Sequence, residues 1–383
     1  MHRRLIALGL LLPLAGWAHG PAPAPLGVAG ASARADGLVR TNIGLALRRD
    51  EVNFHYICPA AWGATDQVPP AGTLTDGTLV VPFGGQVHLG QPDGCGFQAA
   101  PLGAGTASAL ALAGDTAWIA TRQGPDSQLW PVTAAGPGTP VVLPGAEVTD
   151  LAVDAEGDLW AAVARPQAAL VRLHAGELEV QPLDLTGLSY LGLRGEGHFL
   201  HATMPDGPHL YARTPAGPAE VLRAFTSAHG PVAFDGGWLA VADGVLYRAV
   251  GDGPFVMGDE VRWTCLQGRP DGVFACRDRR LYRVEGTLQA PDLVEVFGLE
   301  QLVGVDCPQI EAHALCDGQW LHFGGESGLV RLDAGVDPEP TPPSATEASG
   351  CSAGPGASPS AAVLLLCLGA CLRRRRPARI APS

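Results

Sequence analysis

Short apolar strands, many of them led by an aromatic residue, return along most of this chain at a nearly constant interval. In residues 154–163 an Asp- and Gly-rich turn precedes an apolar strand, and six other stretches align with this one. The aligned positions, 36 to 42 residues apart, are Leu79, Trp118, Trp160, Phe199, Trp238, Phe274 and Ala314. A period of about 40 residues that carries short strands is typical of a propeller or repeat array.

Each repeat contains further strand-like runs. In the repeat marked by Trp160, residues 148–153 precede the mark, while residues 170–173 and 177–180 follow it. Four short strands per 40 residues make one propeller blade. We therefore predict an all-β fold, a seven-bladed β-propeller with four-stranded antiparallel blades, over residues 37–333. A sandwich would not repeat at this interval, and a β-helix would repeat at about 20 residues.

The first 20 residues have the composition of a secretory signal peptide. Arg3 and Arg4 form a charged start, an apolar run covers residues 5–14, and small residues follow. A buried N-terminal helix is the alternative, but the Pro-rich stretch at residues 21–25 cannot continue a helix. We therefore predict an exported protein.

The other end of the chain has three parts in a fixed order. Residues 334–350 form a Pro-rich, acidic linker, and residues 351–376 contain a Cys, a short apolar run and an Arg cluster. The residues concerned are Gly350, Cys351, Arg373, Arg374, Arg375 and Arg376. This order resembles the myxobacterial C-terminal sorting signal (MYXO-CTERM). The resemblance implies that a membrane sorting protease removes the tag and that the protein is displayed on the cell surface. A weak tail anchor in the membrane is the alternative.

The charge balance restricts the partners. The formal net charge is -13, and removing both ends takes away seven of the 25 basic residues, so 18 remain against 38 acids and the charge becomes 18 - 38 = -20. Binding to nucleic acid or to anionic lipid needs clustered cations. We therefore expect no nucleic-acid partner. Solvation of an extracellular surface explains the acidity, although cationic partners and divalent ions remain compatible with it.

Nine Cys are present, and three belong to the C-terminal tail. The remaining six are Cys58, Cys95, Cys265, Cys276, Cys307 and Cys316. An even number in an exported chain favours disulfides. Cys265 with Cys276, and Cys307 with Cys316, each straddle a turn between two strand-like runs, which suits a bond across antiparallel strands. Cys58 is then left for Cys95. Zinc is the competing interpretation, but no C-x2-C spacing occurs.

Two N-terminal stretches differ from the repeat. In residues 42–58 and 87–97, Asp50 and Asp93 are each followed four residues later by an aromatic residue. These stretches resemble degenerate Asp-boxes of sialidase-like propellers, without the usual Ser and Gly, and residues 154–160 resemble strands of NHL-type propellers. Both resemblances imply a fold and neither implies a substrate. We expect residues 42–58 to close the ring by pairing with a strand near residues 329–332.

No catalytic template fits the body of the chain. The only G-x-S-x-G match, residues 350–354, lies in the tail. His198 and His201 stand three apart in a strand and therefore point to opposite faces, which argues against a shared metal ion even with His209 nearby. Four arginines recur late in the third strand of the repeats, where we expect them to cover apolar surface in solvent: Arg172, Arg213, Arg248 and Arg283. We assign no catalytic, cofactor-binding or metal-binding residue.

The sequence therefore predicts an exported, surface-anchored propeller that acts as a non-catalytic binding or scaffold module. Its expected partner is an extracellular protein or carbohydrate, and it would meet the membrane only through the tail before processing. The alternative is an extracellular propeller enzyme, a hydrolase or lyase acting on a carbohydrate or lactone. Acidic residues and arginines that converge in the central channel would favour the enzyme, and a crowded apolar channel would count against it.

Overall fold

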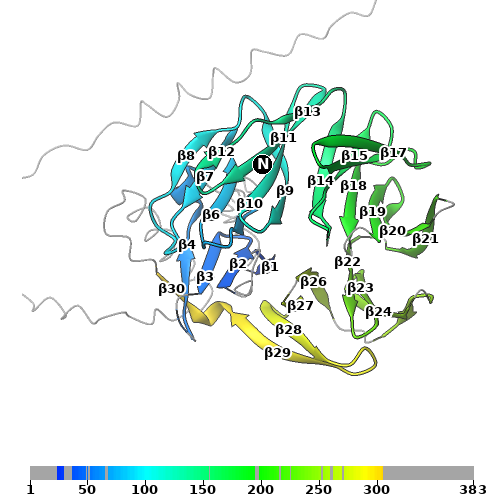
Figure 1. Ribbon diagram of the computed structural model, residues 1–383. Coiled ribbons are helices and arrows are strands. Elements are labelled where there is room, and N and C mark those ends of the chain that lie inside the picture. Colours follow the sequence, from blue (N-terminus) through cyan, green and yellow to red (C-terminus); the bar gives the residue numbers. More distant parts are fainter. Residues whose placement is uncertain are drawn as a thin grey trace, which may run out of the picture. The chain divides into compact units, whose positions relative to one another are not determined.

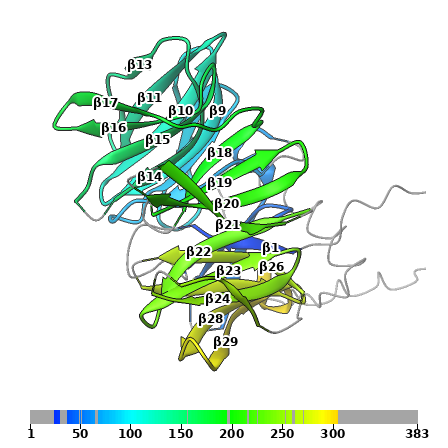
Figure 2. The ribbon, with the colours of Figure 1, turned by 90° about the vertical axis from the view of Figure 1, so that its right-hand side faces the viewer.

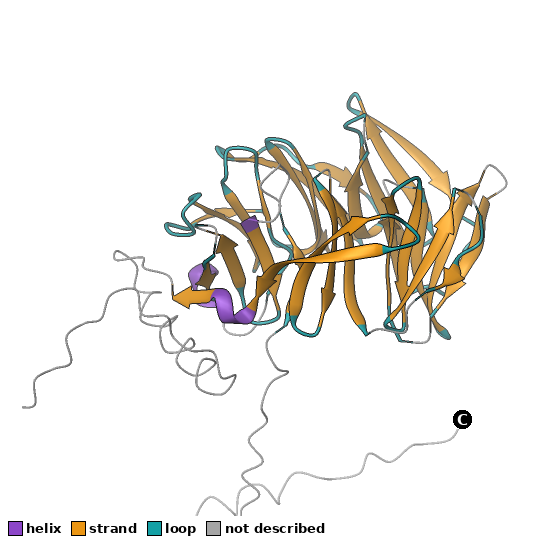
Figure 3. Ribbon diagram, turned by 90° about the horizontal axis from the view of Figure 1, so that it is seen from below, coloured by secondary structure: helices purple, strands orange, loops and turns teal. Residues whose placement is uncertain are grey.

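The computed structural model describes residues 24–304, apart from 30–36, 49, 51, 65–67, 155, 195–197, 215–216, 225, 252, 259–261 and 270. Contacts divide the chain into two units, Met1–Ala334 and Gly335–Ser383, and every described residue belongs to the first unit. Seven sheets follow one another around this unit, and almost all of its described secondary structure is strand (Figures 1 and 3). We number the sheets as blades 1 to 7 in chain order.

The strands of each blade are as follows. Blade 1 contains β1 (Pro25–Val28), β2 (Leu38–Thr41), β3 (Leu45–Arg48), β4 (Phe54–Ile57) and, at its edge, β30 (Leu302–Gly304). Blade 2 contains β5 (Gly72–Thr73), β6 (Leu79–Phe83), β7 (Gln86–Gly90) and β8 (Gln98–Pro101). Blade 3 contains β9 (Thr106–Ala113), β10 (Thr116–Gln123), β11 (Asp126–Thr133), β12 (Gly136–Pro137) and β13 (Val141–Leu143). Blade 4 contains β14 (Glu147–Val153), β15 (Leu159–Arg165), β16 (Ala169–His174) and β17 (Glu177–Pro182).

The last three blades, with blade 4, lie one after another in Figure 2. Blade 5 contains β18 (Tyr190–Arg194), β19 (Phe199–Met204), β20 (Gly207–Thr214) and β21 (Gly217–Arg223). Blade 6 contains β22 (Ala228–Phe234), β23 (Gly237–Ala242), β24 (Val245–Val250) and β25 (Val256–Met257). Blade 7 contains β26 (Trp263–Arg269), β27 (Gly272–Arg277), β28 (Arg280–Gly286) and β29 (Pro291–Gly298). Two 3-10 turns, η2 (Pro59–Trp62) and η3 (Leu299–Gln301), complete the described elements.

The predicted repeat agrees with the blades. The six described marks, from Leu79 to Phe274, all lie on the second strands of blades 2 to 7. The third strands carry a buried Leu at the repeated position, in Leu129, Leu170, Leu210, Leu246 and Leu281. The prediction of a seven-bladed propeller with four antiparallel strands per blade is therefore confirmed.

The Asp-Gly pairs of the repeat form tight hairpin turns. Asp235 and Gly236, between β22 and β23, have φ angles of 47° and 72°, while Phe234 and Gly237 pair across the turn. Asp243 and Gly244 repeat this arrangement before β24, with φ angles of 52° and 83°. Two central residues with positive φ match the twist of antiparallel strands, and Asp with Gly is the sequence best suited to such angles.

Apolar side chains pack between each pair of neighbouring blades. Seven clusters of buried residues lie at the seven junctions, and one of them joins blade 1 to blade 7 through Val28, Phe54, Phe274 and Phe297. The rings of Phe54 and Phe297 meet edge to face with centroids 4.8 Å apart. The ring of blades is therefore closed by hydrophobic packing, which leaves no junction open.

The closure of the ring differs from the expectation in one respect. Residues 42–58 do belong to the closing blade, and β4 pairs in parallel with β30, with Leu302 opposite Phe54. The expected partner strand at 329–332 and the seventh mark at Ala314 lie outside the described residues. Blade 1 is built from the N-terminal strands β1 to β4, and β1 precedes the expected boundary at residue 37. β1 precedes this boundary because it occupies the first-strand position of blade 1, next to blade 7. The repeat pattern does not predict a strand there.

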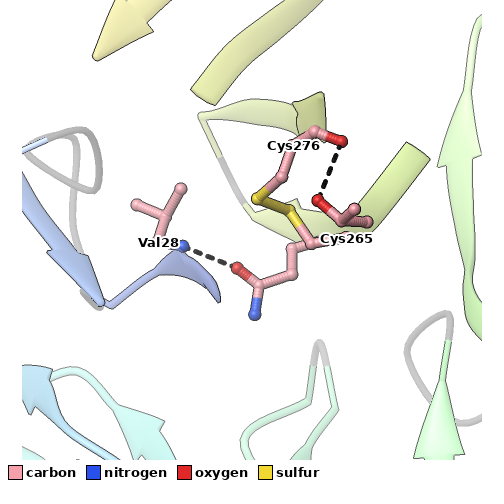
Figure 4. Close-up of a disulfide and its surroundings, with 5 residues drawn as sticks. Val28, Cys265 and Cys276 are labelled. Atoms are coloured by element: carbon pink, nitrogen blue, oxygen red, sulfur yellow. Dashed lines mark hydrogen bonds between the residues drawn. A yellow bond between two sulfur atoms is a disulfide. The ribbon is translucent and has the colours of Figure 1, made fainter. Parts of the chain in front are cut away.

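The structure confirms one of the three predicted disulfides. Cys265 and Cys276 are paired neighbours on β26 and β27 and form a disulfide with a Cα–Cα distance of 4.8 Å (Figure 4). Cys58 and Cys95 are also disulfide-bonded, and the predicted bond between these two stays a prediction. Cys307 and Cys316 lie outside the described residues. So do the predicted signal peptide, the linker and the C-terminal sorting segment.

The two Asp residues assigned to degenerate Asp-boxes both form turns. Asp50 Oδ1 accepts hydrogen bonds from the backbone N–H groups of Val52 and Asn53 at 2.8 and 2.7 Å. Asp93 Oδ1 accepts one from Cys95 N–H at 2.9 Å. Their role is structural, as expected, and the family resemblance itself stays a prediction. Within the described residues no helix has the length and apolar character to cross a membrane.

Candidate functional site

A cavity of about 710 Å³ lies among the first strands of the blades. Its wall is built from β1, β9, β14, β18, β22 and β26, with Pro70 and Ala71 contributing ahead of β5. First strands of a propeller surround its central channel, so six blades and the segment ahead of β5 line this one space. The wall combines small and apolar residues with a limited set of polar ones, an arrangement typical of small-molecule sites.

Blade 7 holds the backbone of β1 at one side of this cavity. Gln267 Oε1 accepts a hydrogen bond from Val28 N–H at 2.7 Å (Figure 4). An Arg269 Nη donates to the Val28 carbonyl at 2.6 Å. Gly27 lies so close to this contact that a Cβ there would stand 2.3 Å from Gln267 Oε1. Only glycine fits at this position, both because of this close contact and because a φ angle of 140° is strained for other residues.

Arg40 on β2 also lines the cavity, and its charge is poorly compensated. Its Nε atom is buried and has no hydrogen-bond partner among the described residues. Burial lowers the pKa of Arg40. A guanidinium remains charged despite such a shift, so the wall contains a desolvated cation.

The opposite wall carries a connected polar group. Arg194 at the end of β18 forms an ion pair with Asp150 of β14 and donates a hydrogen bond to the Tyr190 hydroxyl at 3.2 Å. Burial opposes the charge of Arg194, but Asp150 and Tyr190 outweigh it and raise the pKa of Arg194. Burial also raises the pKa of Tyr190. Asp150 and Arg194 therefore stabilise each other's charge inside the wall.

Two imidazoles lie close to this group, and one of them, His229, belongs to the cavity wall. The ring of His201 contacts Tyr190 with centroids 5.5 Å apart, and neither of its nitrogens has a hydrogen-bond partner among the described residues. Burial, with smaller contributions from Arg194 and His229, lowers the pKa of His201 to about 3. Burial and Arg194 also lower the pKa of His229. Both rings are therefore neutral near pH 7.

The histidines considered as metal ligands have separate environments. His198 contacts the ring of Trp238, and His201 contacts Tyr190. His209 is buried, with Nδ1 2.8 Å from Glu220 Oε2 and Nε2 3.0 Å from Asp206 Oδ1. Across the described stretches no three His, Cys, Asp or Glu side chains form a cluster suited to a metal ion.

The four recurrent arginines lie away from the cavity in the described structure. Arg172 and Arg213 both stack on the ring of Trp160, at 5.4 and 4.8 Å from its centroid. Arg283 pairs with its neighbour Glu285 at 2.5 Å. Arg248 donates to the Gln289 carbonyl at 2.5 Å. None of the four belongs to the described wall of the cavity. The stacking of Arg172 and Arg213 on Trp160 agrees with the expectation that these arginines cover apolar surface, whereas Arg248 and Arg283 contact polar groups.

Sequence reasoning missed the arginines that do line the cavity, which are Arg40, Arg194 and Arg269. Two of them occupy the same repeat position, because Arg194 and Arg269 each end a first strand and each precede their blade's mark by five residues. Following first strands instead of third strands would have found this pair. Arg40 lies on the second strand of blade 1, outside the repeat register, so the pattern does not reveal it.

Comparisons with known proteins find only distant similarities. No family model matches the chain, and no curated protein does. One similar solved structure is PorZ, an essential bacterial surface component of the type-IX secretion system of Porphyromonas gingivalis. It is 14% identical to this chain with a TM-score of 0.48, and the match covers 72% of this chain and 38% of PorZ. A catalytically inactive virginiamycin B lyase from Staphylococcus aureus is 12% identical with a TM-score of 0.43, over 59% of this chain and 83% of the lyase. At these identities nothing about a ligand or an activity follows for this chain.

Proposed function

We propose that this protein is an exported, surface-anchored binding module that holds its ligand in the central cavity without catalysing a reaction. The cavity is the observation that supports this most: about 710 Å³ of space whose wall comes from six of the seven blades and from Pro70 and Ala71 ahead of blade 2. Ligand sites of small molecules have volumes of about 300 to 1,000 Å³. A ligand of this size, or the end of an extracellular carbohydrate chain, suits the cavity better than a folded protein does.

The carboxylates of the wall favour binding over catalysis. Asp150 is held in its ion pair with Arg194. Asp154 accepts hydrogen bonds from Trp160 Nε1 and from Asp158 N–H, both at 2.8 Å. Hydrolysis of a glycoside generally needs one carboxyl group to protonate the leaving oxygen and a second to act as nucleophile or base. Both carboxylates of the described wall already serve internal contacts, so this pair of roles is unfilled.

An extracellular hydrolase or lyase acting on a carbohydrate or lactone is the second candidate function. The criterion set from the sequence favours it, because acidic residues and arginines converge in the central cavity, with Asp150 and Arg194 beside Tyr190. The pKa values of Arg194 and Tyr190 are also raised. Perturbed groups that share a cleft are a feature of active sites, although ion pairs with a structural role produce it too. Turnover of the bound compound, detected as a new product, would decide for the enzyme.

Binding in the cavity can be tested with one pair of variants. Ser108 is an exposed residue of the cavity wall, so Ser108→Trp would place an indole in the cavity. Thr133→Trp adds the same group at an exposed position that is not in the wall. Ligand-observed NMR with a panel of sugars and organic acids should give saturation transfer in the wild type and Thr133→Trp but not in Ser108→Trp. Equal signals in all three proteins would contradict binding in the cavity.

Export and anchoring are supported by the two ends of the sequence and by the Cys265–Cys276 disulfide, since disulfides persist in oxidising compartments. We expect a mature protein that begins near Pro21, ends near Cys351 and is digested when protease is added to whole cells. Intact mass of the protein from fractionated native cells measures this. Uncut protein in the inner membrane would contradict the sorting tag.

A further inference from the structure

Arg40 differs from the other charged residues of the cavity wall because no described residue neutralises it. Arg194 has Asp150 as its ion-pair partner, and Arg269 donates to the Val28 carbonyl. For Arg40, by contrast, Nε is buried without a hydrogen-bond partner in the described chain. The only cause that shifts its pKa is loss of hydration. Burial of a charged group without a partner is unfavourable, so an anion bound at this place would stabilise the Arg40 guanidinium.

A second hydrogen-bond donor lies beside Arg40. Gln267 Oε1 accepts Val28 N–H, which assigns the amide oxygen to β1 and leaves the two hydrogens on Nε2 for another partner. Gln267 belongs to the cavity wall, and its Nε2 is not among the buried atoms without a partner. The amide group therefore presents donors toward the space of the cavity.

Gly27 connects the two donors. It is the paired neighbour of Arg40 across β1 and β2, and residues paired in this way have their Cβ atoms about 5 Å apart on one face of the sheet. The Cβ position of Gly27 points at the Gln267 amide, 2.8 Å from Nε2. The side chain of Arg40 therefore extends from the same face of blade 1 that meets the Gln267 amide of blade 7.

We propose that the Arg40 guanidinium and the Gln267 amide bind the carboxylate of a small organic acid in the central cavity. A guanidinium fork and a carboxylate match each other in geometry and charge, and the amide adds a further donor to the same oxygens. The two carboxylates of the wall, Asp150 and Asp154, are held by other groups and do not compete for the site. This inference rests on the proposed binding function and names the class of its ligand.

Acidic sugars are the probes that test the site best, because each has a neutral counterpart of nearly equal size. Titration calorimetry of the full mature chain with glucuronate and galacturonate, each at millimolar concentration, should give a dissociation constant that glucose and galactose do not. A free acid and the end of an acidic polysaccharide share the carboxylate, so a galacturonate trimer forms a further arm. Tighter binding of the trimer than of the monomer would identify the polysaccharide as the source.

Three variants separate the site from general effects. Arg40→Gln should weaken binding of the acids by about 10- to 100-fold, as expected for losing hydrogen bonds to a charged group. Gln267→Glu keeps an acceptor for Val28 N–H but places a negative charge beside the ligand, so it should fold normally and lose the acids. Arg283→Gln, which removes an exposed arginine of the same blade as Gln267, should bind as the wild type does. If Arg40→Gln does not fold, Arg40→Lys and Gln267→Glu carry the test.

The outcomes distinguish the two proposals. No binding of any acid by the wild type, or equal binding by Arg40→Gln, overturns the carboxylate site. Neutral sugars that bind as well as acids, with binding lost in Ser108→Trp, would also overturn the carboxylate site while leaving the binding function of the cavity in place. Failure of every compound in the NMR panel to bind would instead overturn the proposed function itself.

Discussion

The side-chain oxygen of Gln267 accepts the backbone N–H of Val28 at 2.7 Å, across 239 positions of sequence. This bond joins the first strand of blade 7 to the first strand of blade 1 at the point where the ring closes. A backbone N–H that is buried without a partner costs about 1 to 3 kcal/mol. The closure of the propeller therefore depends on one amide side chain as well as on hydrophobic packing.

Gln267→Ala should lower the free energy of unfolding by about 1 to 3 kcal/mol, because Val28 N–H loses its acceptor. Urea unfolding followed by Trp fluorescence measures the change. Gln123→Ala, at an exposed position of β10, is the control and should unfold within about 0.5 kcal/mol of the wild type. Equal destabilisation by the two variants would show that the bond contributes nothing to closure.

Replacing both Cys265 and Cys276 by Ser should destabilise the protein by about 3 kcal/mol. The bond closes a loop between residues 11 apart, which restricts the unfolded chain. The same urea titration measures this, and intact mass after alkylation verifies that the remaining disulfides are unchanged. An unfolding midpoint equal to that of the wild type would mean that strand pairing alone holds β26 to β27.

His201 should make the folded state less stable in acid. The pKa of the imidazole is about 6.5 in the unfolded chain, whereas burial lowers the pKa of His201 in the folded protein to about 3. Between these values unfolding takes up a proton, so stability falls as the pH falls and this contribution levels off below about 3. His201→Phe, which keeps a ring beside Tyr190, should flatten this part of the stability profile.

The exposed His198 provides the matched control for that profile. His198→Phe makes the same replacement of an imidazole by a phenyl ring, beside Trp238, and its profile is measured in parallel. Thermal melting at intervals of pH gives both curves. Parallel profiles for the wild type and His201→Phe would contradict the assignment.

Gly192→Ala should disturb the polar group in the wall. A Cβ at Gly192 would lie 2.8 Å from both Asp150 Oδ2 and the Tyr190 hydroxyl, so these groups must move apart. We expect a loss of about 1 to 3 kcal/mol in the free energy of unfolding, as for other overpacked sites. Gly138→Ala meets its nearest atom at 3.2 Å and should cost less. A reversed order of the two variants would contradict this packing.

Much of the fold could be predicted from local patterns. The marks at Trp160 and Trp238 fall on second strands, and the Asp235-Gly236 pair forms the expected turn. Cys265 and Cys276 pair as expected because their strands are joined by a short turn. Strand alternation and turn chemistry act over a few residues, so they are readable without tertiary structure.

The candidate site could not be predicted in the same way. Third-strand arginines such as Arg172 recur in the sequence and lie outside the cavity wall. The structure instead places Arg40, Arg194 and Arg269 in that wall. Following the first strands would have found Arg194 and Arg269, but Arg40 lies on a second strand, and its place in the wall depends on how blade 1 is set in the ring. That placement follows from contacts between blades, which single-strand patterns do not contain.

The sequence by itself determined six of the repeats, their strands, their turns and one disulfide, since all of these depend on residues close together in the chain. Only the tertiary structure decided that β1 to β4 build the remaining blade, that Gln267 binds Val28, and that Arg40 lines the cavity with a buried Nε that has no hydrogen-bond partner in the described chain. These features join residues separated by most of the propeller. Their energies arise from burial and from long-range pairing, and both exist only once the ring has closed.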